Sequence, residues 1–71
     1  MRNDNIDEIK KRLKLDYPSY KFEISFNAAI PIYNIYVFKD GRKLSSLSFS
    51  PETSMIEFWG NIQEWMRHLV R

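Results

Sequence analysis

The sequence predicts an α+β fold: a helix, an antiparallel β-meander of three to four strands and a second helix, with both helices packed on one sheet face. Three observations support this order. Apolar residues recur at helical spacing near both ends of the chain, the segments between alternate apolar and polar residues, and a Lys-Asp-Gly sequence separates two of those segments. Because 71 residues suffice for one hydrophobic core, we expect a single domain over residues 1–71.

The first helix is predicted over residues 5–15. Its apolar residues recur at helical spacing, at Ile6, Ile9 and Leu13, with Leu15 near its end. Asn5 and Glu8 have the spacing of a capping box, in which each side chain satisfies a free backbone N–H of the first turn. Pro18 disfavours a helical conformation in the residue before it, so we expect the helix to end there.

Two strands are predicted next. Residues 20–26 alternate, with their apolar side chains on one face: Tyr20, Phe22, Ile24 and Phe26. The second strand, residues 32–38, carries apolar side chains on both faces: Tyr33, Ile35 and Val37 point one way, Tyr36 and Phe38 the other. A short chain builds its core on one sheet face, so the second set, Tyr36 and Phe38, calls for an explanation.

A hairpin follows at the Lys-Asp-Gly sequence, and two registers are compatible with it. A two-residue turn pairs Lys39 with Arg42 and leaves Phe49 on the face opposite Ile35. A three-residue loop pairs Phe38 with Arg42 and brings Phe49 to the same face as Ile35. We favour the second register because it places the apolar residues of both strands on one face.

Residues 50–60 allow two interpretations. A turn at Pro51 would start a fourth strand, with Ile56 and Phe58 facing the core and Met55 and Trp59 facing outward. The second helix would then begin at Asn61, three residues before Glu64 in another capping box, and run to about Val70.

The alternative is one long helix that begins near Ser50, with Pro51 at its first position. It would place Gly60 inside the helix, at a cost of roughly 1 kcal/mol relative to Ala. For that reason we favour the fourth strand. Both helices would then pack on the sheet face that carries the predicted core: Phe22, Ile24, Ile35, Val37, Leu47, Phe49, Ile56 and Phe58.

Composition excludes several classes of protein. The chain has no cysteine, which excludes disulfide bonds and sulfur-based metal clusters and suits a reducing compartment. No apolar run approaches the roughly 20 residues of a membrane span, and the polar start of the chain differs from a signal peptide. We therefore expect a cytoplasmic protein with no cofactor, no bound metal and no membrane partner.

Catalytic motifs are lacking in the sequence. His68 is the sole histidine, and it falls in the last turn of the predicted final helix, where a cation interacts favourably with the helix dipole. Neither a phosphate-binding Gly-rich loop nor a metal-ligand spacing occurs. We expect a protein that is not an enzyme.

The outward side chains of the predicted sheet suggest a binding surface. In the favoured registers they form one apolar patch: Tyr36, Phe38, Leu44, Met55 and Trp59. Large exposed apolar patches on small proteins often mark an interface, and Tyr, Trp and Met are frequent there. The first functional hypothesis is a protein–protein interaction module whose partner is another protein or, in a homodimer, a second copy of the chain.

The alternative hypothesis is a nucleic-acid-binding module. Its residues would be Lys39, Arg42 and Lys43 of the hairpin, which adjoin Tyr36 and Phe38. Cations beside aromatic rings can contact phosphates while the rings stack on bases. The net charge of +2 permits this function without requiring it.

The order of helix, three strands and helix resembles double-stranded RNA-binding domains in outline. That family has a basic cluster at the start of its second helix, whereas the predicted second helix here begins with Asn61, Ile62, Gln63 and Glu64. We therefore assign no family from the sequence.

Overall fold

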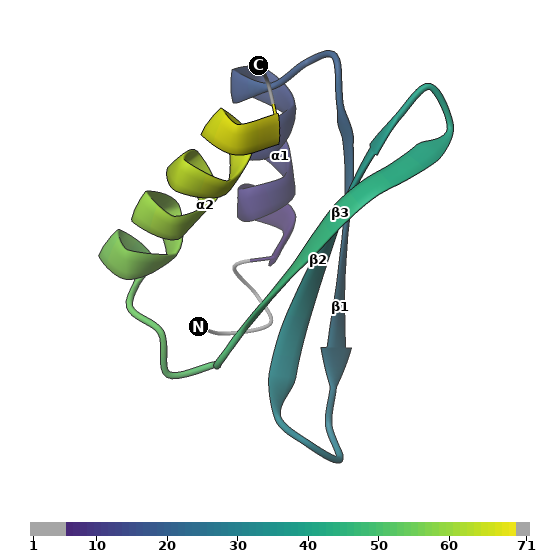
Figure 1. Cartoon of the computed structure of the whole chain (residues 1–71). Helices are drawn as coiled ribbons and strands as arrows, with labels where there is room; N and C mark the ends of the chain where they lie inside the picture. The colour runs from purple at the N-terminus through teal and green to yellow at the C-terminus, as the bar shows by residue number, and fades with distance from the viewer. Residues whose placement is uncertain (1–5, 70–71) are drawn as a thin grey trace.

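The computed structural model describes residues 6–69, which form a three-stranded antiparallel sheet with two helices against one face (Figure 1). The elements follow in the order α1 (Ile6–Asp16), β1 (Lys21–Asn27), β2 (Ile32–Lys39), β3 (Arg42–Phe49) and α2 (Met55–Leu69). The strand order β1-β2-β3 makes β2 the central strand. The predicted α+β class is confirmed. The proposed cap at Asn5 and the helix end at Val70 lie outside the described residues.

Helix α1 places one apolar face on the sheet. Ile9 and Leu13, four residues apart, are 1% and 0% exposed. Leu15 follows the same helical pattern only loosely and is 81% exposed. The Tyr17 amide donates to the Leu13 carbonyl at 2.8 Å, and Pro18 then starts the connection to β1.

Strand β2 has the two-sided character predicted for it. Tyr33, Ile35 and Val37 are at most 2% exposed and face the helices. The residues between them, including Tyr36 and Phe38, are half-buried and point to the other face. We call this second face the outer face; both described helices lie on the opposite side of the sheet (Figure 1).

The β2–β3 hairpin combines features of both predicted registers. Asp40 and Gly41 have φ values of 54° and 78°, as a two-residue type I′ turn requires, and Lys39 pairs with Arg42. A β-bulge then shifts the register by one residue, and Val37 lies opposite Ser45. The favoured three-residue loop is therefore wrong. The face it predicted is nevertheless correct, because the bulge returns the apolar residues of β3 to the core side.

The predicted fourth strand is wrong, because residues 55–69 form the single helix α2. Ser54 caps the helix: its Oγ accepts a hydrogen bond from the Glu57 amide at 3.2 Å. Phe58, Ile62 and Met66 are all at most 1% exposed and recur every four residues, which aligns them along one face. The predicted helix start at Asn61 is also wrong, since that residue lies inside α2.

The core lies between the two helices and the sheet. Aromatic rings connect its layers: Tyr33 stacks on Phe49 with 5.5 Å between ring centroids, and Phe49 contacts the edge of Phe58 at 4.7 Å. Trp65 of α2 also donates a hydrogen bond from Nε1 to Ser45 Oγ of β3 at 3.1 Å. Of the predicted core residues, Ile56 is wrongly placed, because its side chain is 88% exposed on α2.

Gly60 gives a direct test of α2. No atom lies within 4 Å of the position that a Cβ would occupy there, so Ala fits without strain. Gly60→Ala is expected to stabilise the protein by about 0.5–1 kcal/mol, because Ala restricts the unfolded chain and favours helix. Thermal unfolding should show a Tm higher by about 2–8 °C. A lower Tm would indicate that residue 60 lies in a turn that needs glycine.

Neither described helix is both long enough and apolar enough to cross a membrane.

Candidate functional site

The candidate site is the part of the outer face nearest the β2–β3 turn. Tyr36 and Phe38 project from the central strand on this face, two residues apart. The strand register gives each ring a polar neighbour on both sides: Glu23 and Ser46 beside Tyr36, and Lys21 and Lys43 beside Phe38. Phe38 thus lies between two lysines, and Tyr36 lies two residues away on the same face of the strand.

Lysine ammonium groups lie close to aromatic rings at this end of the sheet. Lys43 Nζ is 5.5 Å from the centroid of the Tyr36 ring, and Lys39 Nζ is 5.3 Å from that of Tyr20. Both distances fall within the range of cation–π attraction. The three hairpin cations predicted for nucleic-acid binding, Lys39, Arg42 and Lys43, are all exposed.

Lys21 is the site residue that the sequence analysis missed. Its polar position in an alternating strand indicated only a solvated face, and the pairing of Lys21 with Phe38 places it at the site. Its ammonium lies 3.8 Å from the Glu23 carboxylate, and both side chains are more than half exposed. An exposed pair of this kind contributes little stability, so a ligand phosphate can compete for the lysine.

The opposite end of the outer face is polar. Ser48 Oγ donates a hydrogen bond to Asn34 Oδ1 at 2.6 Å, which links β3 to β2 beyond Tyr36. The aromatic part of the outer face is therefore confined to the half near the turn. Leu44, at the bulge in β3, is 44% exposed.

The predicted five-residue apolar patch does not exist as one surface. Met55 and Trp59 lie on α2, in the helical layer, because residues 55–69 are helical. The Trp59 ring packs against Phe58 at 5.0 Å, and the Arg12 guanidinium lies over it at 4.2 Å. A hollow of about 350 Å³ between the helices is lined by residues of both: Glu8, Ile9, Arg12, Met55 and Trp59. The grouping with Tyr36 and Phe38 is wrong because it depended on the fourth strand.

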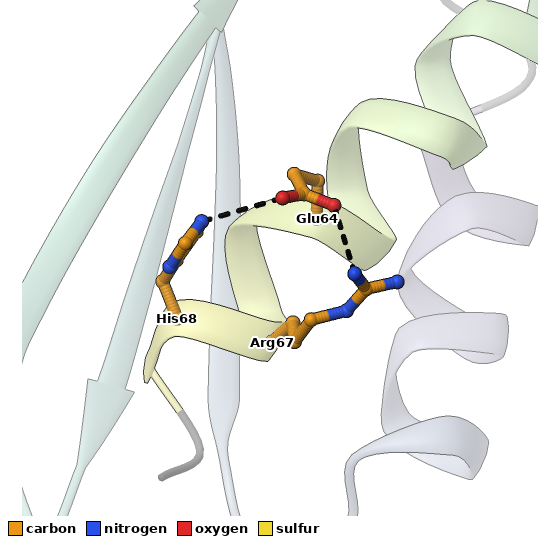
Figure 2. Close-up of polar contacts among 3 residues, drawn as sticks. All are labelled: Glu64, Arg67 and His68. Carbon is orange, nitrogen blue, oxygen red and sulfur yellow. Dashed lines mark ion pairs between the residues drawn. The ribbon is translucent and has the colours of Figure 1, made fainter.

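His68 lies in an exposed ion cluster at the end of α2. Figure 2 shows the Glu64 carboxylate between two partners, with Arg67 Nη1 and His68 Nε2 each at 3.3 Å. All three side chains are more than half exposed, so these pairs are strongly screened by water. Within residues 6–69, no group of three or more His, Asp or Glu side chains is arranged to hold a metal ion.

Comparison of the chain with protein-family models, with curated proteins and with solved structures finds no match. The class of protein can therefore be described only from the fold and the candidate site of this chain. It is a small α+β domain whose outer sheet face carries two neighbouring aromatic residues on the central strand and a lysine on each strand beside it.

Proposed function

We propose that this protein is a non-enzymatic module that binds single-stranded nucleic acid on its outer face. In this proposal Tyr36 and Phe38 stack on bases, while Lys21 and Lys43 contact the phosphates between them. The observation that carries the proposal is the arrangement of these four residues: two aromatic side chains on the central strand with a lysine on each neighbouring strand.

The spacing of the rings suits consecutive bases. Residues two apart on a strand are separated by about 6.6–6.8 Å, which leaves each ring room for its own base. Stacking of a base on an aromatic side chain contributes about 1–3 kcal/mol and accepts every base, because every base has a π face. We therefore expect a high affinity for so small a site and little preference for any base sequence in the nucleic acid.

The charge near the rings supports a polyanion as the ligand. Four cations, Lys21, Lys39, Arg42 and Lys43, surround this end of the sheet, against the two carboxylates of Glu23 and Asp40. The excess of two positive charges here equals the net charge of the whole chain, +2, so the charges of the remaining residues balance.

A single strand is favoured over a duplex as the ligand. Bases in a duplex are stacked on one another and their faces are not available to protein rings. The first turn of α2 also begins with Met55, Ile56 and Glu57 and lacks the cations of double-stranded RNA-binding domains.

The same face is the surface of the protein–protein hypothesis. That hypothesis rested on a five-residue apolar patch, of which Met55 and Trp59 are on α2. On the neighbouring strands, Tyr36 and Phe38 are flanked by lysine, glutamate and serine side chains. Association with a protein or a second copy of the chain is therefore treated as a competing outcome of the test.

The test is fluorescence anisotropy with labelled oligothymidylate and oligouridylate at low salt. The variant Tyr36→Thr/Phe38→Thr keeps strand-forming residues and removes both rings. We expect its affinity to be at least about 30-fold lower, because losing two stacked bases costs at least about 2 kcal/mol. The control Ile56→Ala, which removes an exposed apolar side chain from α2, should bind like the wild type.

Two results would overturn the proposal. One is a wild-type protein that binds neither oligonucleotide at low salt. The other is sedimentation of the wild type as a dimer that the double variant dissociates, since the rings would then lie in a protein interface. A preference between the two oligonucleotides would distinguish DNA from RNA as the ligand.

A further inference from the structure

Two hollows adjoin at the start of β1. The first, about 470 Å³, is lined by Phe38 of the outer face and by Asp40 and Gly41 of the turn. The second, about 370 Å³, is lined by Lys10 and Lys14 of α1. Pro18, Tyr20 and Lys21 line both hollows. The two hollows therefore connect the aromatic end of the outer face to α1 across the edge of β1.

Three lysines, Lys10, Lys14 and Lys21, line this path, with the carboxylates of Glu23 and Asp40 at its end near the turn. Lys10 and Lys14 are four residues apart on α1 and so lie on the same side of the helix. In the described chain, residues 6–69, no carboxylate forms an ion pair with either lysine. Lys21 lies at the junction of the hollows, and Lys39 is held over the Tyr20 ring there.

The path joins cations that are separate in the sequence. Lys10 and Lys14 line it on α1, Lys21 lines it at the start of β1, and Lys39 of the hairpin lies over the Tyr20 ring beside it. Tyr20 and Phe22 line the second hollow together with Lys10 and Lys14. A groove that combines cations with aromatic side chains fits a flexible chain of phosphates and bases better than it fits an apolar peptide.

We propose that the nucleic acid continues from the outer face along these two hollows, with Lys10 and Lys14 contacting its phosphates. This inference rests on the proposed function and adds a second contact region to it. Tyr36 and Phe38 hold the bases at one end, and the lysines of α1 hold the backbone at the other. The protein then binds a longer strand than the two rings alone can occupy.

The test compares oligothymidylates of about 5 and about 15 nucleotides, which lie near the lower and upper ends of the site sizes of small single-strand-binding domains. The variant Lys10→Gln/Lys14→Gln keeps residues of similar helix propensity. We expect it to bind the short strand within about twofold of the wild type and the long strand at least about tenfold more weakly. The slope of log affinity against log salt for the long strand should fall by about 1.4, because the variant neutralises two fewer phosphates.

The matched control is Arg12→Gln/Arg67→Gln, which removes the same charge from residues that line neither hollow. It should bind both strands like the wild type. Equally weakened binding in the two double variants would show an effect of net charge and would overturn the path. So would unchanged binding of the long strand by Lys10→Gln/Lys14→Gln. In either case binding of the short strand would leave the proposed function standing, whereas no binding of either strand by the wild type would remove both.

Discussion

Replacing Phe58 with Ala is expected to lower the free energy of unfolding by about 3–5 kcal/mol. The Phe58 side chain is 1% exposed and contacts Phe49 and Trp59, with ring centroids 4.7 and 5.0 Å away. Its removal would leave a cavity where α2 meets the sheet. Because a chain of this length has a total stability of about 4–11 kcal/mol, this loss is a large part of the total, and we expect a much lower midpoint of unfolding.

The matched control for this prediction is Ile56→Ala, two residues earlier on the same helix. Ile56 is 88% exposed, so its truncation should change the free energy of unfolding by about 0.5 kcal/mol or less. Urea unfolding followed by circular dichroism measures both variants. In a fourth strand both residues would face the core, and comparable losses of stability at the two positions would contradict the helix.

This region shows why residues 55–60 were predicted as a strand and not as the first part of α2. Ile56 and Phe58 satisfy a strand period, while Phe58, Ile62 and Met66 satisfy a helical one. From the sequence, the cost of Gly60 in a helix, roughly 1 kcal/mol, favoured the fourth strand over the long helix. Burying three large side chains contributes about 1.5–3 kcal/mol each, and this tertiary gain outweighs the local preference.

The elements α1 and β1 were predictable because their periods are unambiguous, and the Lys-Asp-Gly sequence located the hairpin of β2 and β3. The bulge in the hairpin was not, because it depends on how β3 pairs with β2 and has no signature in residues 42–49. The candidate site divides in the same way. Tyr36 and Phe38 followed from alternation alone, whereas Lys21 and the groove to α1 required the pairing of strands and the packing of a helix.

Ile35→Ala is the second substitution for which we expect a large loss, about 2–5 kcal/mol of unfolding free energy. Ile35 lies at the centre of the sheet, between Ile24 and Leu47, and is 0% exposed. The loss should appear as a lower midpoint of urea unfolding with little change in its slope. Oligonucleotide affinity of the fraction that stays folded should be unchanged, because Ile35 faces away from the proposed site.

The adjacent residue provides the control, since Tyr36 projects from the opposite face of the same strand. Tyr36→Thr should change stability by no more than about 1 kcal/mol while it weakens oligonucleotide binding. The two variants thus separate the functions of the two faces: one loses stability and the other loses affinity. A stability loss at Tyr36 as large as that at Ile35 would mean that the outer face is a second core, and a ring committed to a core cannot also stack on a base.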